Sequence, residues 1–186
     1  SHEYDAVHGR VIAFLGGRLW VVSDSLRAPG EHHYALNFQL SSAAQGHVEL
    51  QAGPLLHLHS PGLTLLQLQT SGMHSRLADG WVSPRYGHKQ PAPRLCSTLS
   101  ACDADFDTVL MPWALQPARL QLQALAVAGG TRPLQALRLV HGDGVDTWFH
   151  ARGDCAPAWA WDGMHFQGRW LHLRHDTQGR LRSASS

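Results

Sequence analysis

The chain has 186 residues, with 15 basic and 14 acidic side chains and a formal net charge of +1. This length suits one domain with a sizeable core, so we expect a single domain over residues 1–182 and a frayed tail over residues 183–186. The near-neutral charge argues against a nucleic-acid partner, and no apolar run approaches the roughly 18 residues that a membrane span needs. Histidine is abundant, with 14 copies, so the net charge should rise as the pH falls.

The first part of the chain shows short apolar segments of period two, broken by turn residues, as is typical of antiparallel strands. Gly16 and Gly17 permit the positive φ angles of a two-residue hairpin turn, and Pro29 marks a second turn. The segments expected as strands here are residues 11–15, 18–22, 33–40, 47–51, 55–59 and 63–69.

Residues 71–93 are dense in glycine, proline, serine and aromatic residues, which predicts a long irregular loop. Within it, aromatic faces and cationic donors suit a sugar that carries carboxylate or sulfate groups. The candidate substrate-binding residues are therefore Trp81, Arg85, Tyr86 and Lys89. The alternative is that Trp81 and Tyr86 pin the loop onto the sheet while Arg85 forms a structural ion pair.

The second part of the chain continues the same pattern. Residues 115–128 tolerate a helix, but the alternation Leu-Gln-Leu-Gln within them favours a strand. The further segments expected as strands are residues 108–113, 120–128, 134–140, 147–150, 159–161, 164–166 and 170–175. About a dozen short strands without sustained helical periodicity predict an all-β fold, a large antiparallel β-sandwich with no substantial helix.

Three cysteines, Cys96, Cys102 and Cys155, do not form a disulfide framework because their number is odd. Cys96 and Cys102 would close a small loop in an oxidising compartment, and three unpaired thiols are the alternative. The chain begins with Ser1 and shows no signal peptide, so we expect an internal start with further chain upstream.

Two histidines of one expected strand, His57 and His59, lie two residues apart and therefore face the same side. Such a pair would hold a metal ion if a neighbouring strand supplied a third ligand. The alternative is that both face solvent while Leu56 and Leu58 point inward. His172 is expected to face solvent in the same way.

His8 lies at the mouth of the first strand, and the first hairpin would bring it near Asp24 or Arg10. We expect structural pairing there, with His8 and Tyr86 as the candidate catalytic residues of this chain. No serine or cysteine nucleophile motif and no glycine-rich phosphate loop occurs in the sequence. The carboxylates are scattered and are expected mostly in turns: Asp103, Asp105, Asp107, Asp143 and Asp146.

Several short motifs follow one another along most of the chain. They are His2-x-Tyr4, His8-x-Arg10-x-Ile12, Trp20-Val21-Val22-x-Asp24, Gly30-Glu31-His32-x-Tyr34, Gly80-Trp81-x-Ser83-x-x-Tyr86-Gly87-x-Lys89 and Arg174-x-Asp176-x-x-Gly179. Their order and spacing resemble the C-terminal part of the heparinase II/III-like polysaccharide lyases. Gln39 stands where relatives often have histidine.

The resemblance implies an enzyme that joins an N-terminal α/α toroid to a C-terminal β-sandwich and cleaves uronic-acid polysaccharides by β-elimination. In that family the catalytic groups lie largely on the toroid, and the sandwich adds a His-x-His-x-Asp stretch and a metal site near its beginning. This chain has no such stretch, since His57-Leu58-His59 is followed by Ser60 and Pro61. The resemblance therefore assigns no catalytic residue, metal ligand or cofactor to this segment, and leaves a metal ion to the parent enzyme.

We thus expect the sandwich part of a carbon–oxygen lyase, inactive alone, with the upstream toroid and an acidic polysaccharide as partners. The resemblance favours a bacterial protein that is periplasmic or secreted. The alternative is a non-catalytic carbohydrate-binding or assembly sandwich. A third hypothesis is a sandwich that builds its own site from His8, Arg10 and Tyr86.

Overall fold

The computed structural model describes residues 5–112, 120–127, 134–151 and 158–186. The prediction of an all-β, antiparallel fold is confirmed, since every strand pair in this part of the chain is antiparallel. Within the described ranges, the helical content is a single 3₁₀ turn, η1 (Ser42–Ala44). None of the described residues form a helix able to cross a membrane.

The chain divides into two compact units, Ser1–Ala114 and Leu115–Ser186. Each has its own hydrophobic cluster of buried side chains. The expectation of one domain over residues 1–182 stays a prediction.

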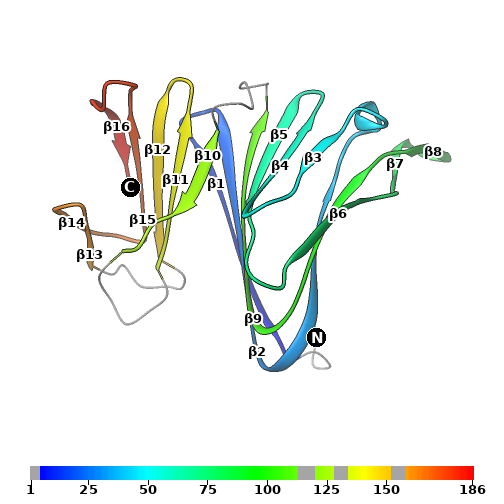
Figure 1. The fold of residues 1–186 in the computed structure, drawn as a ribbon, viewed down its shortest axis with the longest axis horizontal. Helices are drawn as coiled ribbons and strands as arrows, with labels where there is room; N and C mark the ends of the chain where they lie inside the picture. The colour runs from blue at the N-terminus through cyan, green and yellow to red at the C-terminus, as the bar shows by residue number, and fades with distance from the viewer. Residues whose placement is uncertain (1–4, 113–119, 128–133, 152–157) are drawn as a thin grey trace. The chain divides into compact units, whose positions relative to one another are not determined.

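The first unit is built on one sheet in the order β1-β2-β9-β5-β4-β3, with β6 paired to another part of β9 (Figure 1). β7 and β8 form a separate hairpin. The predicted first hairpin is confirmed, but its loop has three residues instead of the predicted two: Gly16 (φ 55°), Gly17 (φ 71°) and Arg18 lie between Leu15 of β1 and Leu19 of β2. The strands are β1 (Val7–Leu15), β2 (Leu19–Gln39), β3 (Glu49–Gln51), β4 (Leu55–Ser60), β5 (Leu63–Leu68), β6 (His74–Ala78), β7 (Trp81–Arg85), β8 (His88–Pro91) and β9 (Arg94–Pro112).

Two long strands, β2 and β9, run side by side and bend together (Figure 1). The sequence predicted separate short strands, whereas the structure joins them into single bent strands. At the bend the pairing is interrupted between Arg27 and His32, so that residues 28–31 have only Cys102 opposite them. This is a wide irregularity of the bulge type, which bends a strand locally.

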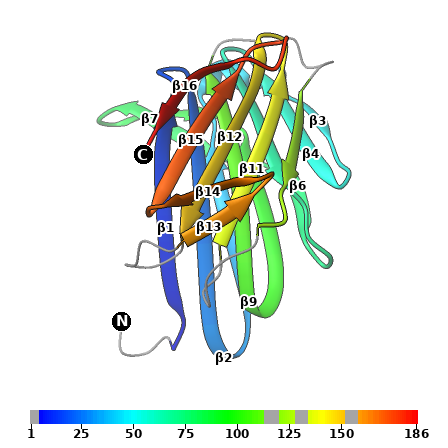
Figure 2. The ribbon, with the colours of Figure 1, turned by 90° about the vertical axis from the view of Figure 1, so that its left-hand side faces the viewer.

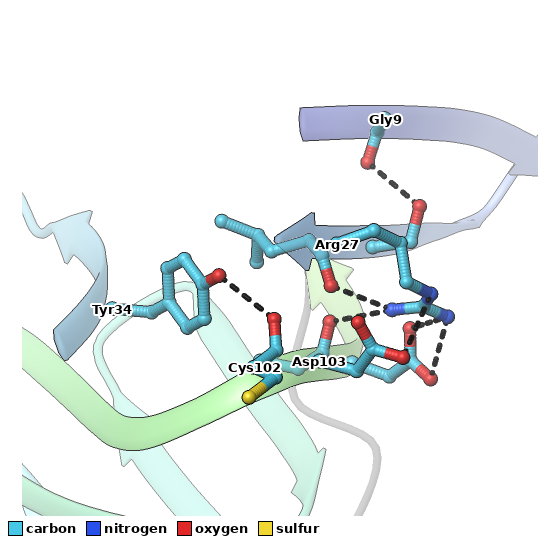
Figure 3. Close-up of polar contacts among 9 residues, drawn as sticks. Gly9, Arg27, Tyr34, Cys102 and Asp103 are labelled. Atoms are coloured by element: carbon cyan, nitrogen blue, oxygen red, sulfur yellow. Dashed lines mark hydrogen bonds and ion pairs between the residues drawn. The ribbon is translucent and has the colours of Figure 1, made fainter. Parts of the chain in front are cut away.

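Side chains hold the backbone at this bend (Figure 3). The Arg27 guanidinium donates to the carbonyl oxygens of Leu26 (2.8 Å) and Ala104 (3.2 Å) and to the Asp105 carboxylate (2.9 and 3.2 Å). The Tyr34 hydroxyl donates to the carbonyl oxygen of Cys102 at 3.0 Å. These bonds satisfy backbone carbonyls beside the point where the strand ladder is interrupted.

The bend lets the two halves of the β2–β9 pair face each other across a hydrophobic cluster. Its buried members are Tyr34, Leu36, Met73, Leu99, Ala104 and Phe106. A second cluster lies under β4 and β5 and contains Leu40, Ala44, Leu56, Leu58, Leu65 and Leu95. In β9 the buried apolar positions are odd before the bend (Leu95, Leu99), even just after it (Ala104, Phe106) and odd again near its end (Val109, Met111).

The second unit is a five-stranded sheet in the order β10-β11-β12-β15-β16, with a β13–β14 hairpin beside it. Figure 2 shows this hairpin crossing the strands of the sheet. The hairpins predicted between residues 134 and 150 and between residues 159 and 166 are confirmed. The strands are β10 (Gln121–Ala124), β11 (Leu134–His141), β12 (Gly144–Ala151), β13 (Ala158–Trp161), β14 (Met164–Gln167), β15 (Trp170–His175) and β16 (Leu181–Ser185).

Three expectations are corrected by the structure. Residues 71–93 are no irregular loop, since they contain β6, β7 and β8. Residues 183–185 belong to β16 and pair with β15, because Arg182 and Arg180 bind Asp176 (2.7 and 3.0 Å) and shape the preceding turn. Asp103, Asp105 and Asp107 lie in strand β9 instead of in turns.

Both described cysteines, Cys96 and Cys102, are free thiols on β9. The loop-closing disulfide between them is therefore not formed in this structure. Cys155 lies outside the described residues.

Candidate functional site

Two basic side chains of the edge strand β1 converge on one carboxylate of β2. His8 Nε2 and Arg10 Nε each lie 2.6 Å from Asp24 Oδ1. Arg10 is the direct partner of Asp24 in the strand ladder, and His8 is two residues away on the same face. The expected proximity of His8, Arg10 and Asp24 is confirmed.

The three side chains differ sharply in burial. The Asp24 side chain is 2% exposed, whereas those of His8 and Arg10 are 49% and 44% exposed. A buried carboxylate needs charged or hydrogen-bonding partners, which the two basic groups supply. Asp24 thereby fixes both basic groups while about half of each stays accessible to a ligand.

Some hydrogen-bonding capacity at this site is unused among the described residues. Asp24 Oδ2 is buried and has no hydrogen-bond partner there. Arg10 uses only its Nε, which leaves its two terminal nitrogens as donors for an anion. A guanidinium held in this way presents a preformed fork to a carboxylate or sulfate group.

A cavity of about 140 Å³ lies beside these groups. It is bounded by both halves of the bent strand β2 and by β9. Its apolar wall comes from Leu26, Leu36 and Phe106. Tyr86 is not among the lining residues, so this cavity does not unite it with His8 and Arg10.

The same face of β1 continues from the basic pair to an apolar region. Ile12 and Phe14 are exposed, and Trp20 stacks on Phe14 with ring centres 4.3 Å apart. Arg10 and Phe14 are four residues apart, which corresponds to about 13 Å along a strand. We call this surface the β1 strip, and its residues are His8, Arg10, Ile12, Phe14 and Trp20.

The candidate substrate-binding residues of segment 71–93, which was predicted to be a loop, lie on the β7–β8 hairpin. This hairpin projects from the first unit (Figure 1). Lys89 Nζ lies 4.3 Å from the ring centre of Trp81. Tyr86 is fully exposed at the turn, and Arg85 is also exposed. Tyr86 therefore does not pin this segment to the sheet, and Arg85 has no ion pair with another described residue.

The histidine pair on β4 has the predicted alternation, since Leu56 and Leu58 are fully buried while His57 and His59 are half-buried. Burial lowers the pKa of the His57 imidazole. His59 Nδ1 lies 3.1 Å from the Thr64 hydroxyl. Among residues 5–112, 120–127, 134–151 and 158–186, no group of three histidine, cysteine or acidic side chains is arranged to hold a metal ion.

The expectation that His172 faces solvent is wrong. His172 is buried and its Nε2 lies 2.7 Å from Asp146 Oδ1. His141 Nε2 lies 2.7 Å from the other oxygen of Asp146. Sequence reasoning missed this buried His–Asp–His group, because only the pairing of β11, β12 and β15 brings the three residues together.

Gln39, at the end of β2, makes hydrogen bonds to the segment that precedes β9. Its Nε2 donates to the carbonyl oxygens of Ala92 (3.3 Å) and Pro93 (3.1 Å). Gln39 thus ties the end of β2 to the segment between β8 and β9.

A protein-family model described as "Heparinase II/III-like, C-terminal" matches residues 2–154. This range includes the β1 strip, Asp24 and the β7–β8 hairpin. A comparison with curated proteins finds no match.

Proposed function

Because the chain belongs to the heparinase II/III-like C-terminal family, we propose that it is the β-sandwich part of a polysaccharide lyase. The parent enzyme would cleave a uronic-acid-containing polysaccharide by β-elimination, in the bacterial periplasm or outside the cell. A base removes the proton next to the uronate carboxyl, and an acid protonates the leaving oxygen. Cationic groups that bind the carboxylate stabilise the negative charge that develops there.

The observation that carries this proposal is the β1 strip. Arg10 and His8 are fixed on the buried Asp24 yet half exposed, so they suit a uronate carboxylate. The exposed Phe14–Trp20 stack offers a flat apolar surface to neighbouring sugar rings. An acidic polysaccharide laid along β1 would meet both features.

In this proposal the chain supplies binding and not the proton transfers. The toroid upstream would carry the base and the acid, and any metal ion would belong to the parent enzyme. Asp24 is a positioning residue, since it acts through the two basic groups that it holds. The isolated chain should therefore bind the polysaccharide and release no unsaturated uronate.

The test is the affinity of the isolated chain for polyglucuronate and polygalacturonate, measured by titration calorimetry against neutral dextran. We expect Arg10→Ala and Phe14→Ala each to weaken binding of one of these polyanions at least about tenfold, a loss of about 1.4 kcal/mol. Arg76→Ala is the matched control, because Arg76 is an exposed arginine on β6. Equal affinities of Arg10→Ala and the unaltered chain would contradict the role of the strip.

The β7–β8 hairpin supports a second candidate function, a carbohydrate-binding sandwich without a catalytic partner. Its exposed Tyr86 and Arg85 and its Trp81–Lys89 pair would then bind the glycan. Loss of binding in Tyr86→Ala and Trp81→Ala, with Arg10→Ala unaffected, would favour this candidate.

A third outcome concerns the oriented imidazole of His8. A histidine held by a buried carboxylate is an arrangement that suits a general base. Release of unsaturated uronate by the isolated chain, abolished in His8→Gln, would make the chain itself an enzyme.

A further inference from the structure

The β13–β14 hairpin crosses the strands of the second unit's sheet (Figure 2) and packs against β12. Trp159 and Phe166 of the hairpin pack on Phe149 of β12, with ring centres 5.9 and 5.3 Å away. Beside this contact lies a hollow of about 320 Å³. Its principal lining residues are Arg138, Thr147, Trp161, Asp162, Met164 and His175.

Two basic side chains enter this hollow from strands on either side of β12. Arg138 on β11 is the ladder partner of Thr147, and His175 on β15 is the ladder partner of Val145. Both are half-buried, and neither forms an ion pair or side-chain hydrogen bond with another described residue. A partly buried guanidinium without a counter-charge favours an anionic ligand.

Among the described residues, no acidic side chain at the hollow neutralises these groups. Asp162 is the acidic residue of the lining, and it is exposed at the hairpin turn. It makes no ion pair with Arg138 or His175 among the described residues. The remaining lining groups are uncharged.

Trp161 supplies an aromatic wall. Its ring meets Phe149 edge to face, with centres 5.3 Å apart and planes at 61°. This contact fixes the indole at the side of the hollow, because such aromatic pairs have a preferred geometry. An aromatic wall beside two cationic donors suits a ring that carries a negative group.

We propose that this hollow binds one acidic sugar unit, with its carboxylate on Arg138 and His175 and its ring against Trp161. The site is separate in the chain from the β1 strip. It shares the ligand class of the proposed function but stands on its own residues. In the parent enzyme it would hold a polysaccharide at a second point.

The test is an NMR titration of the chain with D-glucuronate, with D-glucose and acetate as matched probes. We expect glucuronate to shift the indole N–H signal of Trp161 and to bind at least about tenfold more tightly than glucose or acetate. Arg138→Gln should weaken glucuronate binding about tenfold, and Arg76→Gln should leave it unchanged. Trp161→Phe, which retains an aromatic core contact, should weaken binding less than Arg138→Gln.

Three results would overturn the proposal: acetate bound as tightly as glucuronate, no response of Trp161 at saturating glucuronate, or full affinity in Arg138→Gln. Arg10→Ala separates this inference from the proposed function. It should leave the Trp161 response unchanged even if the β1 strip proves to bind nothing.

Discussion

The buried Oδ1 atom of Asp24 holds the half-exposed side chains of His8 and Arg10 in place. Asp24→Asn removes the charge that holds His8 and Arg10, and it places an amide donor or acceptor where Oδ2 has no partner among the described residues. We expect a loss of about 2 kcal/mol in the free energy of unfolding, measured by urea denaturation. Asp79→Asn is the control, since Asp79 is exposed, and it should change stability by less than about 0.5 kcal/mol.

Asp176 gives a prediction for acid pH. The backbone N–H of Arg180, its side chain and the backbone N–H of Gln178 lower the pKa of Asp176 to about 2. The unfolded chain has a carboxyl pKa near 3.9, so the stabilising contribution is complete above about pH 4. It should be lost as the pH falls toward 2, when the folded carboxylate is protonated.

The measurement is the carboxyl carbon chemical shift of Asp176 as a function of pH. A midpoint near 2 is expected, and a midpoint near 4 would contradict the turn geometry. Asp176→Asn should remove this part of the pH dependence of unfolding.

Sequence patterns predict which residues are buried only where a strand has one apolar face. They succeed for β4, where Leu56 and Leu58 are buried and the intervening His57 is half-buried. They fail for His172, because β15 has buried residues on both faces: His172 on one and Leu173 on the other. The convergence of His8 and Arg10 on Asp24 was predictable, since a hairpin with a short turn fixes its own register.

At the scale of elements, β12 and β15 approach each other closely at Gly144, where the backbone of His175 lies against the glycine. Its φ is +141°, and a Cβ atom there would collide with the backbone carbonyl of His175. We expect Gly144→Ala to destabilise the protein by more than about 2 kcal/mol in thermal or urea unfolding. Gly142→Ala, in the same turn but in open space, should cost less than about 1 kcal/mol.

The short hairpins of this fold are readable from sequence, because Gly-Gly and Asp-Gly turns lie between alternating segments. The long bent strands are not. Pro29 and Gly30 are typical of the end of a strand. In the structure β2 continues past them, and the Arg27 and Tyr34 side chains donate hydrogen bonds to backbone carbonyl oxygens of β9 at the bend. In β9 the buried apolar positions change from odd to even at the bend and back to odd near its end. The sequence therefore shows no single alternation over the 19 residues of this strand, Arg94–Pro112.

At the scale of the whole chain, the 14 histidines far exceed the formal net charge of +1, so their protonation dominates the change of charge with pH. Imidazoles with an ordinary pKa near 6.5 become cationic as the pH falls from 7 to 5.5. The affinity for polyglucuronate should therefore rise over this range and fall with added salt, because salt screens exposed charges. Binding that is independent of salt and pH would contradict an electrostatic contribution, and neutral dextran is the control.

The expected single domain has a consequence for unfolding. One domain over residues 1–182 should unfold in one cooperative transition, with coincident fluorescence and circular dichroism curves. Phe106→Ala and Phe149→Ala, which remove buried rings from different units, should each lower the same midpoint. Two separate transitions, each sensitive to one variant, would show that the two compact units are independent domains.

The irregularity opposite Cys102 also bears on how this chain can change in length over evolution. Elsewhere in β2 and β9, an insertion of one residue would turn every following side chain to the opposite face of the sheet. Residues 28–31 together have one residue of β9, Cys102, opposite them. A residue inserted or deleted there therefore leaves the strand pairing on both sides of the bend unchanged. Insertions and deletions among relatives should therefore gather at this bend, leaving the Asp24 side and the Tyr34 side of β2 intact.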